Sequence, residues 1–110
     1  MRIEVLSIDD CPNSRIAIGE AEAALASLGL SEIHVIERRV TSHEEAMATA
    51  FAGSPTVLVD GVDVIPGTVP TGSLACRLYR TETGTTGYPS RAQIIAAIRA
   101  HSGTRESPVR

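Results

Sequence analysis

The junction at residues 9–14, Asp-Asp-Cys-Pro-Asn-Ser, is the sequence feature that most restricts how this chain can fold. An apolar run from Ile3 to Ile8 precedes it, and a run with helical spacing follows it. Pro12 suits the first turn of a helix, where its missing N–H group would have no partner in any case. The sequence therefore places Cys11 between the carboxyl end of a strand and the amino end of a helix.

A cysteine in this position is favourable for thiol chemistry. Free backbone N–H groups and the positive end of the helix dipole stabilise a thiolate, so the pKa of a thiol there tends to fall. The carboxylates of Asp9 and Asp10 oppose this effect. For their own role, helix capping and favourable charge at the helix N-terminus is the interpretation we favour over proton transfer. Ser14 is a candidate hydrogen-bond donor to the thiolate. In the alternative interpretation, Cys11 is a small buried apolar residue and Ser14 is an ordinary first-turn serine.

The composition limits the classes of function. The 110 residues suffice for one domain with a modest core, and 43% of them are apolar, as in globular proteins. A net charge of −3 gives no electrostatic basis for binding nucleic acid or an acidic membrane surface. The chain has two cysteines, no export signal and no apolar stretch of the roughly 20 residues that cross a membrane. We therefore expect a cytoplasmic protein with reduced thiols.

Hydrophobic spacing and turn residues predict an α/β domain over residues 1–101 with the order β-α-β-α-β-β-α. Right-handed crossover then gives a four-stranded mixed sheet with three helices, the first and last of them on one face. A long loop is predicted at 66–89 and a flexible tail at 102–110. The predicted strands are 1–8, 32–40, 56–60 and 62–65, and the predicted helices are 11–28, 42–51 and 90–101.

Two short motifs resemble those of the thioredoxin-like superfamily. The Cys-Pro-Asn-Ser sequence at 11–14 is similar to the C-x-x-C or C-x-x-S redox motif at the start of the first helix. The Ser-Pro-Thr sequence at 54–56 resembles the cis-proline loop that faces the active cysteine across a cleft. The resemblance implies a thioredoxin-like fold, and it implies that the backbone of this loop aligns the substrate. The implied substrate-binding residues are Ser54, Pro55 and Thr56.

The same resemblance implies a thiol-dependent oxidoreductase that acts on a disulfide or a small electrophile. Cys11 would be the nucleophile, and Ser14 stands where a C-x-x-C protein has its second cysteine. The mixed disulfide would then be resolved by a small thiol, glutathione or mycothiol, or by Cys76 in the long loop. No other cofactor is expected. Alternatively, Cys76 is a buried residue of a short strand.

Two other functions stay open. The chain also resembles small bacterial thioredoxin-like proteins associated with organomercurial lyases. That resemblance implies soft-metal or organomercurial handling by Cys11 and Cys76, with a proton from Asp9 or Asp10. The other alternative is a non-catalytic interaction domain, for instance a homodimer along an exposed edge strand. The three histidines lack metal-ligand spacing, so no further metal site is predicted.

Overall fold

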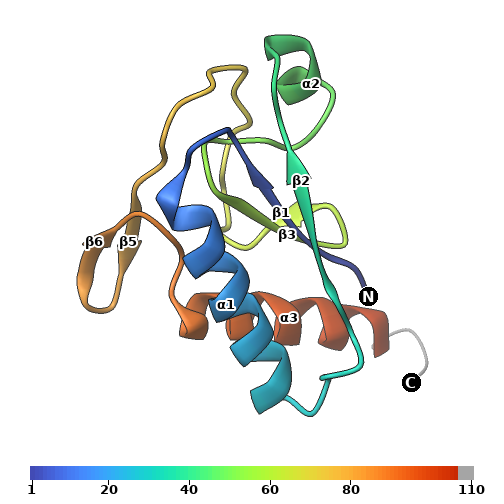
Figure 1. Cartoon of the computed structure of the whole chain (residues 1–110). Coiled ribbons are helices and arrows are strands. Elements are labelled where there is room, and N and C mark those ends of the chain that lie inside the picture. Colours follow the sequence, from blue (N-terminus) through green and yellow to red (C-terminus); the bar gives the residue numbers. More distant parts are fainter. Residues whose placement is uncertain (107–110) are drawn as a thin grey trace.

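The main sheet and three helices form the body of the protein (Figure 1), and the computed structural model describes residues 1–106. The strands are β1 (Ile3–Ser7), β2 (Val35–Arg39), β3 (Thr56–Val59) and β4 (Val62–Asp63), and the helices are α1 (Pro12–Ser27), α2 (His43–Met47) and α3 (Arg91–Glu106). The strand order is β2-β1-β3-β4, with β2 parallel to β1 and β3 antiparallel to both β1 and β4. The predicted α/β class with a four-stranded mixed sheet and three helices is confirmed for the described residues.

One face of the sheet packs against α1 and α3. Alternate residues of β1 and β3 point to this face, as the two-residue period of a strand requires. Alanines supply most of the α1 contacts, so the helix backbone can approach the sheet closely. The buried core residues of this layer are Ile3, Val5, Ala17, Ala21, Ala24, Leu25, Val57, Val59, Val64, Ile94 and Ile98. This packing sets the direction of α1 and thereby the position of Cys11.

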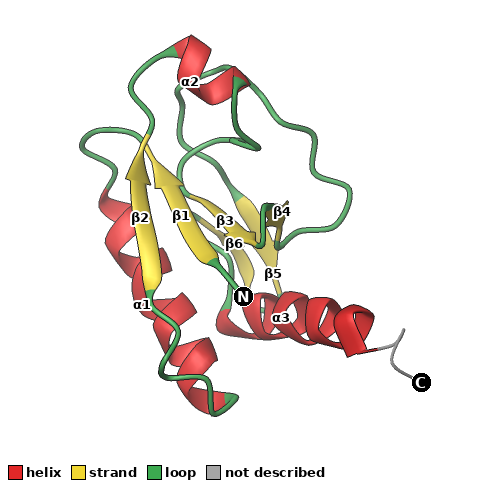
Figure 2. Ribbon diagram, turned by 90° about the vertical axis from the view of Figure 1, so that its right-hand side faces the viewer, coloured by secondary structure: helices red, strands yellow, loops and turns green. Residues whose placement is uncertain are grey.

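The opposite face carries a smaller core centred on Phe51, which has no exposed surface. Its buried neighbours are Leu6, Val40, Ala46 and Leu58. The short helix α2 contributes to this core, and its N-terminus is capped because the Ser42 hydroxyl accepts the Glu45 N–H at 3.0 Å. Figure 2 shows α2 at the end of the sheet away from α3.

The structure differs from the sequence-based prediction at several segments. Helix α2 ends at Met47 rather than at residue 51, and β4 ends at Asp63 rather than at residue 65. The predicted loop 66–89 contains a second, two-stranded sheet, formed by β5 (Tyr79–Thr81) and β6 (Gly84–Thr86). Strands of three residues are too short to show a hydrophobic period, so the spacing did not reveal them. Helix α3 continues to Glu106, beyond the predicted end at His101, and the rest of the predicted tail, 107–110, lies outside the described residues. None of the helices described has the length and apolar character needed to cross a membrane.

Candidate functional site

Cys11 occupies the N-cap position of α1, with φ −91° and ψ 108°. No side chain of the described residues caps this helix end. The thiol therefore lies at the amino end of a 16-residue helix, and among the described residues no carboxylate or hydroxyl oxygen competes with it for the free backbone N–H groups there. Its residue is 9% exposed, which leaves a small part of the side chain open to solvent. The predicted position of Cys11 at the strand–helix junction is what the structure shows.

The hydroxyl of Ser14 is engaged with the backbone. It donates to the carbonyl oxygen of Cys11 at 3.1 Å, and the Ser14 N–H donates to the same oxygen at 3.3 Å. A first-turn serine commonly makes such a bond to a carbonyl three residues earlier. Ser14 thus holds the first turn closed, and the role predicted for it, a donor to the Cys11 thiolate, is not the one seen here.

Among the described residues neither aspartate caps α1, so the capping part of the favoured interpretation of Asp9 and Asp10 is wrong. Asp9 instead accepts a hydrogen bond from the Arg39 guanidinium at 2.8 Å, and this bond raises the pKa of Arg39. Because Arg39 offsets the charge of Asp9, that carboxylate acts less strongly on Cys11 than its place in the sequence suggests. Asp10 has a left-handed backbone, φ 59°, which turns the chain so that Cys11 rather than Asp10 becomes the cap.

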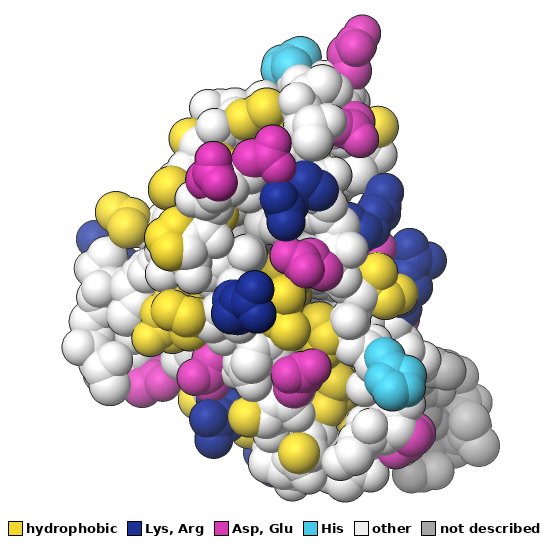
Figure 3. Space-filling view, viewed as in Figure 1, with side chains coloured by type: hydrophobic (Ala, Val, Ile, Leu, Met, Phe, Trp, Pro, Cys, Tyr) yellow, Lys and Arg dark blue, Asp and Glu magenta, His cyan; other side chains and the backbone are white. Residues whose placement is uncertain are grey.

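An open hollow adjoins Cys11 between α1 and β2. Its lining includes Asp10, Cys11, Ser14, Arg15, Glu22 and Arg39. Figure 3 shows this face of the molecule, on which acidic and basic side chains lie next to one another around apolar ones. The hollow thus combines one thiol, charges of both signs and the apolar side chains of Ile8, Ile16 and Ile18, which suits a small ligand with a charged group.

Ser7 is a feature that sequence reasoning missed. Its side chain has no exposed surface, and its Oγ is the one buried side-chain polar atom without a hydrogen-bond partner among the residues described. By strand alternation it points to the α1 face, like Ile3 and Val5. Ser7 also pairs in register with Arg39, which lines the hollow. Buried hydroxyls without a partner are rare in proteins, and this one lies at the end of β1, beneath the start of α1.

The predicted cis peptide bond is present between Ser54 and Pro55. Its surroundings differ from the prediction, because Ser54, Pro55 and Thr56 are all buried. The Ser54 N–H donates to Ala75 O and the Ser54 carbonyl accepts from Arg77 N–H, each at 2.9 Å. The chain itself already uses the backbone groups that were expected to align a substrate. In this arrangement the three residues are buried structural groups beneath the site and do not present free backbone groups to a substrate.

Cys76 lies at the centre of the segment that pairs with Ser54, in an isolated parallel bridge. It is exposed, so its interpretation as a buried strand residue is wrong. Ser54 connects it to the Cys11 region, because the Ser54 hydroxyl accepts the Ile8 N–H at 3.1 Å. Both cysteines are free thiols, and Cys76 does not line the hollow beside Cys11. The hollow is therefore a one-cysteine site.

Arg77 and Gly87 contact the rest of the protein and hold the 66–89 segment beside these residues. Arg77 makes a bidentate ion pair with Asp63 at 2.8 and 3.2 Å, and its guanidinium carbon lies 4.3 Å from the centre of the Tyr79 ring. Gly53, with φ 107°, must lack a side chain, because a Cβ there would come within 2.8 Å of the Arg77 Cβ. A Cβ at Gly87 would come within 2.2 Å of the Asn13 side-chain nitrogen, so the segment also reaches the first turn of α1.

Tyr79 is expected to stay protonated at alkaline pH as long as the fold persists. Burial raises the pKa of its phenol, which donates a hydrogen bond to Pro55 O. When folding raises the pKa of a group, that group stabilises the folded state. For tyrosine this stabilisation is complete below the pKa of the unfolded chain, about 10, and it is lost as the pH rises above that value. Below the alkaline unfolding transition, wild type and Tyr79→Phe should therefore give the same tyrosinate absorbance. A smaller signal in the variant would contradict this prediction.

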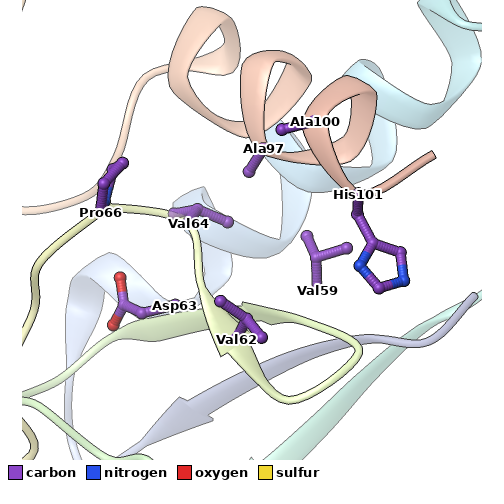
Figure 4. Close-up of a pocket in the computed structure, with 8 residues that line it drawn as sticks. All are labelled: Val59, Val62, Asp63, Val64, Pro66, Ala97, Ala100 and His101. Carbon is purple, nitrogen blue, oxygen red and sulfur yellow. The ribbon is translucent and has the colours of Figure 1, made fainter. Parts of the chain in front are cut away.

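A second, apolar pocket of about 280 Å³ lies between β4 and α3 (Figure 4). It is at the end of the sheet opposite to Cys11, since Val59 in its lining pairs with Ile3 at the start of β1. His101 forms one side of the pocket, and its Nε2 contacts the Asp60 carboxylate. Among the described residues, the lining contains no cysteine and no serine, and the pocket lies apart from the thiol site.

Comparisons of the chain with protein-family models, with curated proteins and with solved structures found no match. The functional argument therefore depends on the geometry around the two cysteines.

Proposed function

We propose that the chain is a thioredoxin-like thiol–disulfide oxidoreductase that uses Cys11 as its single active cysteine. The element order, the cysteine at the start of α1 and the cis peptide bond at Pro55 support the thioredoxin-like assignment. The reducing cytoplasmic setting expected from the sequence is part of the proposal, because Cys11 must be free to react.

The observation that carries the proposal is the uncapped N-terminus of α1 at Cys11. Backbone N–H groups at this helix end have no side-chain acceptor among the described residues, so a thiolate at Cys11 can serve as their negative partner. The unpartnered hydroxyl of Ser7, on the same side of the sheet, is a further potential donor near this helix end. The adjoining hollow gives a small disulfide a route to the sulfur.

The proposed reaction has two exchange steps. The Cys11 thiolate attacks one sulfur of a disulfide R–S–S–R′, so that a Cys11–S–S–R bond forms and R′–S⁻ leaves. A second small thiolate then attacks the sulfur of R in the mixed disulfide, which forms a new disulfide and releases the Cys11 thiolate. Glutathione and mycothiol are candidates for this thiol. Because Cys76 does not line the hollow, the small thiol is preferred over Cys76 as the resolving group.

The test is the rate at which the protein reduces a small mixed disulfide in the presence of excess thiol. Wild type and Cys76→Ser should turn over at similar rates, while Cys11→Ser should not exceed the rate without protein. Equal rates for wild type and Cys11→Ser would contradict the proposal.

Soft-metal or organomercurial binding by both cysteines is the second candidate function. The specific observation in its favour is that Cys76 is exposed and forms a β-bridge with Ser54. The Ser54 hydroxyl in turn accepts a hydrogen bond from the N–H of Ile8, the residue that follows β1. Thiolates prefer soft ions such as Hg²⁺. If this candidate holds, one equivalent of Hg²⁺ should block both thiols in wild type. Blocking of one thiol per equivalent would contradict a shared site.

A further inference from the structure

Arg15 lies one helical turn after Cys11 on the same side of α1. Residues four apart on a helix are neighbours, separated by about 6 Å along the axis. Both side chains line the hollow between α1 and β2. A ligand whose sulfur reaches Cys11 would therefore have its next few atoms beside the Arg15 guanidinium.

The two arginines of the hollow differ in their partners. Arg39 is held by Asp9 at 2.8 Å and by Glu37 at 3.6 Å. Arg15 is exposed and has no hydrogen-bond or ion-pair partner among residues 1–106. Its guanidinium is thus the cation of the hollow that is available to a ligand. A guanidinium binds a carboxylate through two parallel N–H donors, a geometry that matches both groups.

We propose that Arg15 recognises an anionic group on the compound that reacts with Cys11. The inference rests on the proposed function, and it narrows the substrate class to small thiols or disulfides that carry a carboxylate within about one helical turn of the sulfur. Peptide thiols derived from cysteine meet this requirement, whereas a neutral sugar thiol does not. Arg15 is then a specificity-determining residue, and Cys11 remains the reacting group.

The test compares two thiol reagents on Cys76→Ser, in which Cys11 is the remaining cysteine. Dithiobis(nitrobenzoate) carries a carboxylate on each ring, and dithiodipyridine carries no charge. At low salt, Arg15→Gln should slow the anionic reagent about threefold to tenfold, the range expected for one charge contact near the surface. The neutral reagent should react at an unchanged rate. The difference should largely disappear at about 1 M salt.

Arg80→Gln is the matched control, because it removes the same charge from an exposed position in β5 that does not line the hollow. It should leave both rates unchanged. If Arg15→Gln slows both reagents equally, or neither, or if Arg80→Gln has the same selective effect, anion recognition by Arg15 is overturned while the proposed function stands. If Cys11 reacts with neither reagent in the parent protein, the proposed function fails together with the inference.

Discussion

Arg77→Leu should lower the free energy of unfolding by about 3 kcal/mol, because it leaves the Asp63 carboxylate buried without its partner. The two side chains are only 11% and 10% exposed, so solvent compensates little for the lost pair. The substitution also removes a hydrogen bond to Thr68 and the stacking of the guanidinium over Tyr79. The measurement is urea unfolding at neutral pH, followed by circular dichroism.

The double variant Asp63→Leu/Arg77→Leu separates the ion pair from simple loss of packing. Removing both charges leaves no buried carboxylate, so the double variant should recover part of the stability lost in Arg77→Leu, the remainder being the hydrogen bond at 2.8 Å that Asp63 accepts from the Ile65 N–H. If the double variant is no more stable than Arg77→Leu, the loss does not come from an unpaired charge at Asp63.

Phe51→Ala should also destabilise the fold strongly, by about 3–5 kcal/mol. Phe51 has no exposed surface and is the largest fully buried side chain described, so its removal leaves a cavity between α2 and the sheet. Met47→Ala is the control, since Met47 is the last residue of α2 and is 62% exposed. Its truncation should change the stability by less than about 0.5 kcal/mol. Similar losses for the two variants would mean that Phe51 is not the centre of this core.

Local sequence signals were sufficient for the main elements. The apolar residues of β1 and the helical spacing of α1 are properties of consecutive residues, and so are Pro12 and the serine cap of α2. The order of these elements then determines a mixed sheet through the crossover rule. The β5–β6 hairpin was not predictable in this way, because its stability depends on contacts such as the buried Tyr79 packed under Arg77.

The site was only partly predictable, for a similar reason. The position of Cys11 follows from the strand–helix junction, but the partners of its neighbours come from distant parts of the chain. Asp9 binds Arg39, which is 30 residues away, and Ser54 pairs with the segment around Cys76. No local pattern shows that these partners occupy Asp9 and the backbone of Ser54. Arg39 engages the carboxylates of Asp9 and Glu37, whereas the guanidinium of Arg15 has no partner among the described residues, and no local pattern shows this difference.

The most direct test of the central claim is to identify which cysteine forms the first mixed disulfide. Wild-type protein is mixed briefly with less than one equivalent of a small disulfide, the reaction is stopped with acid, and the modified peptide is found by mass spectrometry. Exposure alone favours Cys76, because Cys76 is exposed and Cys11 is buried. A reactive thiolate at the uncapped end of α1 predicts that Cys11 carries the adduct first. An adduct found first on Cys76, with Cys11 unmodified, would contradict the account.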